Sequence, residues 1–243
     1  GKTTLTGLRD YNNISACVCL VENHSDGIET KMHALGFGSY LVLNGHFFRK
    51  NNGYMIIKSH HGEFRVKNMK QLKIFGVDRK DMALLQLPKD FPPFPRKLRF
   101  RAPEKGESIV LVGNNFQDKY ISSMVSESCK TFPRDAGGFW KHWISTKEGS
   151  CGQPLVSVRD GFIVGIHSLC SEVSEVNYHT SVADDFEARI LAKTDSLEWE
   201  KNWFYNPNSV CWGGISIPDN KPDDIFRADK VAETLMSEIV SEQ

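Results

Sequence analysis

The stretch from Thr146 to His167 constrains the fold most, because it predicts two strands joined by a tight turn. An apolar run follows Cys151 and stops at the turn Arg159-Asp160-Gly161. A second apolar run, Phe162 to Ile166, ends on His167. Two runs bounded in this way are typical of a β-hairpin. Cys151 and His167 would then lie at the same end of the sheet.

The position of Cys151 between Gly149 and Gly152 indicates a nucleophile on a tight turn. Glycine adopts the backbone dihedrals that let successive N–H groups point into one site. Such groups can hold an oxyanion, and the loss of one of these donors costs about 10²–10³ in rate. We therefore predict an oxyanion hole at the backbone of Gly149 and Cys151. The alternative is that Cys151 is a small buried hydrophobic residue, as most free cysteines are.

A cysteine nucleophile needs a base, and the base needs a group that orients it. His46 follows the apolar run Tyr40 to Leu43, on a turn just past the end of a predicted strand. Asp81 stands immediately before the strand-like run Met82 to Leu87. The chain order His46, Asp81, Cys151 is one of the orders known for catalytic triads. Taken singly, His46 could be a turn histidine and Asp81 a solvated loop carboxylate.

The remainder of the chain predicts an all-β fold. Short alternating runs such as Tyr54 to Lys58 and Glu63 to Lys67 recur between glycine, proline and asparagine turns. Short helices are predicted only towards the C-terminus, at Phe186 to Lys193, Ser196 to Trp203 and Ala228 to Val240. A chain of 243 residues is long enough for one large or two small β domains.

The charge and cysteine pattern narrows the function classes. The formal net charge of zero gives no overall attraction to nucleic acid. No apolar run approaches the roughly 18 residues of a membrane span, and the start of the chain lacks a charged-then-apolar signal segment. The six cysteines include no Cys-x-x-Cys pair. We therefore expect no metal, no cofactor and no structural disulfide, in a reducing compartment.

Several long fragments, spread along nearly the whole chain, are similar to one known family. They include Lys89-Asp-Phe-Pro-Pro-Phe-Pro95, Phe139-Trp-Lys-His-Trp-Ile144, Gly149-Ser-Cys-Gly152 and Gly161-Phe-Ile-Val-Gly-Ile-His-Ser168. On these motifs the chain resembles the nuclear inclusion a proteases of potyviruses. The resemblance implies an all-β, chymotrypsin-like fold of two six-stranded antiparallel barrels with the active site between them. Short helices would lie near the C-terminus.

The resemblance also implies a division of the chain. Residues 1–112 would form the first barrel and carry His46 and Asp81. Residues 113–217 would form the second barrel with Cys151 and the S1 pocket, and residues 218–243 a C-terminal tail.

The activity that the resemblance implies is that of a cysteine endopeptidase. The enzyme would cleave a viral polyprotein after glutamine and before a small residue. His46 would be the general base, Asp81 its orienting partner, and Cys151 the nucleophile that forms a thioester acyl-enzyme. The family also implies residence in the nucleus and cytoplasm of the host cell. We expect a monomer or weak dimer with no membrane partner.

Selection of glutamine requires a donor for its neutral side-chain carbonyl group. The His167 ring and the Thr146 hydroxyl can supply one, and the resemblance gives both residues this role. A pocket whose donors stay unpaired with the wrong substrate can reject it by about 10⁴ or more. Glu148 lies at the rim of this predicted S1 pocket.

We expect an extended substrate to add a strand in a groove beside Ser168-Leu169-Cys170, with the segment from Trp212 to Ile217 on its other side. The chain stops at Val240-Ser-Glu-Gln243. These four residues are therefore expected to occupy the P4 to P1 positions, with Gln243 as the P1 residue of a self-cleavage site. The released tail would act as a product inhibitor.

The main alternative is a non-catalytic RNA- or protein-binding module on the same fold. The alternating run Lys97-Leu-Arg-Phe-Arg101 gathers basic residues on one face. The simplest interpretation is a solvated strand face, and weak RNA binding is the alternative. A thiol-dependent redox protein is a third interpretation, but it lacks a resolving Cys-x-x-Cys pair. Alkylation of the thiol separates these classes, because it would abolish proteolysis and spare a binding module.

Overall fold

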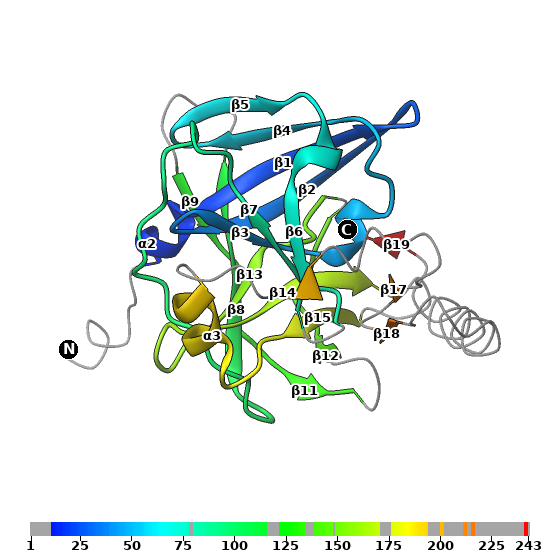
Figure 1. Ribbon diagram of the computed structural model, residues 1–243. Helices are drawn as coiled ribbons and strands as arrows, with labels where there is room; N and C mark the ends of the chain where they lie inside the picture. Colours follow the sequence, from blue (N-terminus) through cyan, green and yellow to red (C-terminus); the bar gives the residue numbers. More distant parts are fainter. Residues whose placement is uncertain are drawn as a thin grey trace.

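The computed structural model describes residues 11–77, 80–115, 122–134, 139–147, 149–170 and 176–193, with the strand pairs 200–201, 211–212, 215–216 and 241–242. Figure 1 shows two β layers, one above the other. The upper layer comes from the first part of the chain, drawn blue to cyan, and the lower from the green-to-yellow part. This two-sheet, mostly β architecture confirms the predicted fold class.

The first sheet has eight strands among the described residues, in the spatial order β16-β6-β7-β3-β2-β1-β4-β5. Every pairing in it is antiparallel. Its strands are β1 (Val18–Ser25), β2 (Ile28–Phe37), β3 (Tyr40–Leu43), β4 (Tyr54–Ser59), β5 (Gly62–Val66), β6 (Lys73–Gly76), β7 (Ala83–Gln86) and β16 (Glu200–Lys201).

The second sheet has nine strands among the described residues, with the main order β10-β8-β13-β14-β15-β12-β11. Two further strands join it, β9 on β8 and β19 on β14. The nine are β8 (Ser108–Asn115), β9 (Ser122–Val125), β10 (Cys129–Lys130), β11 (Phe132–Pro133), β12 (Phe139–His142), β13 (Pro154–Ser157), β14 (Ile163–Cys170), β15 (Asn177–Ser181) and β19 (Ser241–Glu242).

The remaining elements are short. A third sheet consists of β17 (Cys211–Trp212) and β18 (Ile215–Ser216). The α-helices are α2 (Asn12–Ser15) and α3 (Phe186–Lys193), and the 3-10 turns are η1 (Gly45–Phe48) and η2 (Met69–Gln71). Helix α3 matches its predicted bounds. No helix in the described part of the chain combines the length and hydropathy needed to cross a bilayer.

Strand β8 contains the predicted boundary at residue 112. It pairs with β13, β10 and β9 of the second sheet. Among the described residues the first sheet has eight strands and the second nine, and several of these strands are only two residues long. One of them, β16, follows helix α3 in the chain and pairs with β6 of the first sheet.

Glycines shape the turn that leads to the site. The sequence gives one run from Leu35 to Leu43, but the structure folds it into β2 and β3 around Gly38, which has a φ of +57°. At Gly36 an added Cβ would lie 2.3 Å from the Phe94 ring, so only glycine allows this close packing. The reversal delivers β3, and therefore the residues after it, to the middle of the sheet.

The hydrophobic core runs between the two sheets. Strand β8 contributes Val110 and Val112 to the large cluster that also contains Phe37 and Cys151, while Ile109 and Leu111 face a separate small cluster. This alternation follows from the period-2 geometry of a strand. The large cluster therefore joins both sheets directly behind the nucleophile.

The basic run from Lys97 to Arg101 does not form a free cationic face. Arg99 Nε lies 2.7 Å from Glu187 Oε1, and Arg101 pairs with Glu107 and Asp160 at 2.8 Å each. Carboxylates thus already neutralise both guanidinium groups. The RNA-binding hypothesis for this run gains no support.

Candidate active site

His46 and Asp81 form a buried pair. Strand β3 ends at Leu43 and the turn η1 places His46 just beyond it, while Asp81 precedes β7, the strand paired with β3. Asp81 accepts hydrogen bonds from His46 Nδ1 at 2.7 Å and from the His46 amide at 2.9 Å. Adjacent antiparallel strands thus bring the two residues together as the sequence predicted.

The carboxyl group of Asp81 is held ionised by its surroundings. Burial opposes its ionisation. The charge of His46 and the hydrogen bonds from His46 and Asn44 outweigh that effect and lower the pKa of Asp81 below its usual value. An anionic Asp81 fixes the proton of His46 on Nδ1 and leaves Nε2 as the atom that can accept a proton.

Asn44 connects this pair to the second sheet. Its side-chain amide, fully buried, lies 3.2 Å from Asp81 Oδ2, 3.1 Å from the His167 carbonyl and 3.0 Å from Ser168 Oγ. Thr180 adds a second link, because its hydroxyl lies 2.5 Å from Ser168 Oγ and donates to the Asp81 carbonyl at 3.3 Å. The acid, the base and strand β14 are therefore held as one unit.

Three parts of the chain contact one edge of β14 in succession. They are strand β13, the nucleophile Cys151 and the tail strand β19. Strand β13 pairs with it up to Ile166, and the amide of Gly152 then donates to the His167 carbonyl at 2.8 Å. The next carbonyl, that of Ser168, accepts from Cys151 Sγ at 2.9 Å. Beyond it, Leu169 and Cys170 pair with β19. Cys151 thus lies at the point where the edge of β14 becomes available to another strand.

The first sheet holds the nucleophile loop in place through His33 of β2. The His33 amide donates to the Cys151 carbonyl at 2.8 Å, and its ring Nδ1 lies 2.6 Å from the Gly149 carbonyl. Burial lowers the pKa of His33 to about 4, so the neutral ring donates its Nδ1–H to Gly149. At Gly152 an added Cβ would lie 1.9 Å from the His33 carbonyl. Only glycine fits at position 152.

The loop backbone has the geometry that the sequence suggested. Gly149 and Gly152 have φ values of +89° and +87°. The Gly149 amide, placed here by the turn around Cys151, has no acceptor in the part of the chain that the structure describes. A free amide beside the nucleophile is what an oxyanion donor requires.

The predicted pocket residues take different places. His167 is fully buried on β14. Thr146 lines a hollow of about 670 Å³ between the sheets, together with Lys31 and His33 of β2 and with Gly149. Glu148 lies outside the described residues.

The predicted groove is partly formed. Strand β19 runs antiparallel to β14, with Glu242 opposite Leu169 and Ser241 opposite Cys170. From Ser241 to Glu242 the tail therefore advances towards Ser168 and the nucleophile. The backbone of β17, which contains Trp212, lies beside η1. Gln243 lies outside the described residues, as does the whole of the predicted tail helix from Ala228 to Val240.

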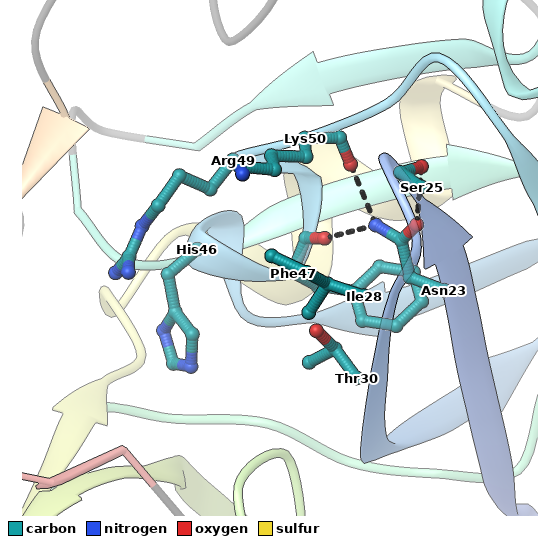
Figure 2. A pocket seen from close by; sticks show the side chains of 8 residues that line it. All are labelled: Asn23, Ser25, Ile28, Thr30, His46, Phe47, Arg49 and Lys50. Atoms are coloured by element: carbon teal, nitrogen blue, oxygen red, sulfur yellow. Dashed lines mark hydrogen bonds between the residues drawn. The ribbon is translucent and has the colours of Figure 1, made fainter.

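A second, smaller hollow of about 150 Å³ opens beside His46 (Figure 2). The ring of His46 borders it, and Ile28, Thr30 and Phe47 line its floor. Asn23 shapes its far wall, because its amide donates to the carbonyls of Phe47 and Lys50 at 2.7 Å each. The His46 ring thus separates this hollow from the edge of β14.

Among the described residues, four cysteines and one group of carboxylates with a histidine are the candidates for metal or redox chemistry. Cys17, Cys19, Cys129 and Cys151 are free thiols. Burial raises the pKa of Cys17 to about 11, which makes it unreactive. One group with metal-ligand spacing exists, Glu22 with His24 and Glu29, but Lys58 Nζ already lies 2.7 Å from Glu22.

Sequence reasoning missed three residues at the site. The sequence pattern does not single out Asn44, His33 or Thr180. Their positions give little signal, because each acts on a partner far away in the chain. For Asn44 the single clue is an amide next to the base histidine at the end of an apolar run.

Comparison with known proteins places this geometry in a family. The model of peptidase family C4 matches residues 1–233. The chain is 48% identical, over its full length, to part of the genome polyprotein of Ornithogalum mosaic virus, and 47% identical over 236 residues to that of Peanut mottle virus (strain M). It spans 21% and 8% of these two polyproteins.

Solved structures agree with the sequence comparison. Catalytically active tobacco etch virus protease complexed with product is 49% identical, with a TM-score of 0.79, over 88% of this chain and 93% of that one. Tobacco vein mottling virus protease is 44% identical, with a TM-score of 0.77, over 87% and 96%. A serine endoprotease from Yersinia pestis, 18% identical with a TM-score of 0.52 over 77% and 65% of the two chains, shares the fold alone. With a family match over nearly its whole length and close likeness to proteases of this fold, the chain belongs to peptidase family C4 and is a cysteine endopeptidase.

Proposed function

We propose that this endopeptidase cleaves a viral polyprotein after glutamine and before a small residue. The observation that carries the proposal is the edge of β14, where a peptide strand pairs with Leu169 and Cys170 directly beside the Cys151 thiol. Strand addition of this kind holds an extended peptide by its backbone and leaves specificity to side-chain pockets. The relatives that match the full chain are polyproteins, which supports the substrate class.

The reaction proceeds by acyl transfer. Cys151 Sγ attacks the carbonyl carbon of the scissile bond, and His46 Nε2 takes the thiol proton. The oxyanion is stabilised by the amides of Gly149 and Cys151. The C–N bond then breaks, and His46 returns the proton to the leaving amine. A water molecule gives its proton to His46, attacks the thioester and releases the acid, and the thiol is protonated again.

The thiol must reorient before it reacts. In the structure Cys151 Sγ lies 2.9 Å from the Ser168 carbonyl oxygen and donates to it. A substrate strand beside β14 brings its own carbonyl to this position, and rotation of the thiol towards His46 then starts the reaction. Asp81 keeps His46 in the tautomer that accepts at Nε2.

The S1 pocket of the proposal contains His167 and Thr146. His167 lies on the same strand as Ser168, one residue from the carbonyl that meets the thiol. A glutamine side chain entering there presents a neutral carbonyl oxygen to the donors of the pocket. On the other side of His46, the hollow of about 150 Å³ suits a small residue after the cleaved bond.

The tail supplies a model substrate. Strand β19 approaches the nucleophile from the side on which the acyl part of a substrate would lie. A peptide with Val-Ser-Glu-Gln before the cleaved bond and glycine or serine after it is therefore the first substrate to use. The same register makes Gln243 the proposed P1 residue of a self-processing site.

The test compares three reactions. Wild-type protein should cut this peptide after glutamine, Cys151→Ala should not, and a peptide with glutamate in place of glutamine should be cut much more slowly. Cleavage that persists in Cys151→Ala would refute the assignment of the nucleophile. If the folded wild type leaves every glutamine peptide intact, the substrate proposal is wrong, and the binding-module alternative is favoured.

A further inference from the structure

Three buried histidines lie side by side beneath the proposed S1 site. His142 comes from β12, His167 from β14 and His179 from β15, and all three are fully buried. The ring of His142 lies with its centroid 5.3 Å from that of His167 and 5.8 Å from that of His179.

The hydrogen bonds around His142 determine which nitrogens carry protons. The Ile144 amide donates to His142 Nδ1 at 3.2 Å, so this nitrogen must be bare. A neutral His142 then carries its proton on Nε2, which lies 3.2 Å from His167 Nδ1. His142 therefore donates to His167, and His167 Nδ1 is bare in turn. The proton of a neutral His167 must lie on Nε2.

The cluster also disfavours a positive charge. Burial, reinforced by the neighbouring rings of His167 and His179, lowers the pKa of His142 well below its usual value. Burial likewise lowers the pKa of His179 to about 3. The Thr131 hydroxyl donates to the Lys141 carbonyl at 2.8 Å, so it accepts from His179 Nε2 at 2.9 Å, as a neutral His179 allows.

We propose that His142 is a positioning residue that holds His167 as a neutral donor with its proton on Nε2, and thereby sets the preference for glutamine over glutamate at P1. This inference rests on the proposed role of His167 in the S1 pocket. A neutral N–H matches the carbonyl oxygen of a glutamine side chain. A glutamate carboxylate would be buried there without a counter-charge, which is costly. An imidazolium, by contrast, would attract that carboxylate.

A purely structural role makes a different prediction. If His142 only fills space, its replacement lowers stability and alters both substrates equally. If it fixes the tautomer of His167, replacement lets His167 place its proton on Nδ1, or become charged. The first change weakens glutamine binding and the second favours glutamate. Both lower the ratio of the two kcat/KM values.

The main test is a pair of variants measured on peptides that differ only in glutamine or glutamate at P1. In His142→Phe the donor is lost, and kcat/KM for the glutamine peptide should fall roughly 10- to 100-fold, as expected when a buried partner is removed. The ratio of glutamine to glutamate cleavage should fall with it. His142→Gln keeps an N–H donor at similar reach and should retain the ratio within a few-fold.

His179→Phe is the matched control. It removes another fully buried ring of the cluster but leaves the His142 to His167 hydrogen bond intact. This variant should leave the glutamine to glutamate ratio near that of the wild type. An unchanged ratio in folded His142→Phe would overturn the inference, and so would an equal loss in His142→Gln.

A second measurement uses only the wild-type protein, so it does not depend on whether a variant folds. The ¹⁵N chemical shifts of labelled histidine rings distinguish protonated from bare nitrogens. At pH 7 the wild type should show His142 and His167 with bare Nδ1 and protonated Nε2. A proton on His167 Nδ1, or on both of its nitrogens, would overturn the inference.

His167→Ala separates this inference from the proposed function. If that variant retains the full preference for glutamine, His167 does not read P1 and the proposed S1 pocket is wrong. If the preference is lost in His167→Ala but kept in His142→Phe, the pocket stands and only the role of His142 fails.

Discussion

Replacement of Asn44 by alanine should damage stability and catalysis together. The Asn44 amide is the fully buried link between Asp81, the His167 carbonyl and Ser168 Oγ. Alanine removes its two N–H donors and leaves those acceptors short of a partner.

The magnitude follows from the partners that are lost. A hydrogen bond to a charged group contributes about 1.5–3 kcal/mol, and a buried unsatisfied acceptor costs about 1–3 kcal/mol. We therefore expect a loss of about 3 kcal/mol in the free energy of unfolding. For a chain of this size that corresponds to a fall in Tm of about 6–12 °C. Asp81 loses its hydrogen bond from Asn44 but keeps those from His46, so kcat/KM should fall about 10- to 100-fold. That is well short of the ~10⁴-fold loss of kcat seen when the aspartate of a triad no longer sets the tautomer of its histidine.

The loss of stability should depend on pH. The pKa of Asp81 is lowered in the folded state, so its contribution is present above the unfolded pKa and disappears as the pH falls through the folded pKa. Removal of Asn44 raises the folded pKa towards the unfolded one. The destabilisation relative to the wild type is therefore complete at pH 7 and shrinks as Asp81 becomes protonated.

Thermal unfolding at pH 7 and at about pH 2, below the ordinary pKa of an aspartate, with peptide kinetics at pH 7, tests this reasoning. Asn114→Ala is the control, because the buried Asn114 amide bonds only neutral groups, the carbonyls of Ser15 and Val18. Its destabilisation should be similar at both pH values. An equal loss of stability at both pH values in Asn44→Ala, or a kcat/KM within twofold of the wild type, would refute the argument.

Three further predictions follow from other contacts. His33→Ala should lower kcat about tenfold with little change in KM, since the Gly149 carbonyl loses a donor without any loss of substrate contact; a change confined to KM would contradict this. Arg101→Met should destabilise the protein by about 3 kcal/mol at pH 7, as for a broken buried ion pair. The loss should be smaller in acid, because the pKa values of Glu107 and Asp160 are lowered in the folded state. Equal urea midpoints for the variant and the wild type would contradict this. Deletion of residues 240–243 should lower the KM for peptides by removing β19 from the edge of β14; an unchanged KM, and unchanged inhibition by the free tail peptide, would show that the tail does not compete.

The places of the three residues proposed as a triad could be predicted because local chemistry marks them. His46 and Asp81 each stand next to a short apolar run, and Cys151 stands between glycines before a hairpin. Strand ends and tight turns leave a signal within a few residues, so the structure places all three where the sequence did.

Contacts between distant segments could not be predicted in the same way. The alternation of β8 shows which side chains share a face, but it does not reveal which sheet the strand joins. Asn44 acts on Ser168, which lies 124 residues away, and its role depends on how two sheets dock. The return of β16 to β6 involves two residues, too few for any periodicity to show.

The pairing of β19 with β14 has a consequence for solubility. A sheet edge with unpaired N–H and C=O groups is a template for strands of other molecules, and folded proteins cover or interrupt such edges. Under the proposed function the edge beside Leu169 and Cys170 has to receive a substrate strand. In the structure β19, a strand of the same chain, pairs with this edge. Protein that lacks this strand should therefore aggregate more readily at high concentration, and a bound peptide should restore its solubility.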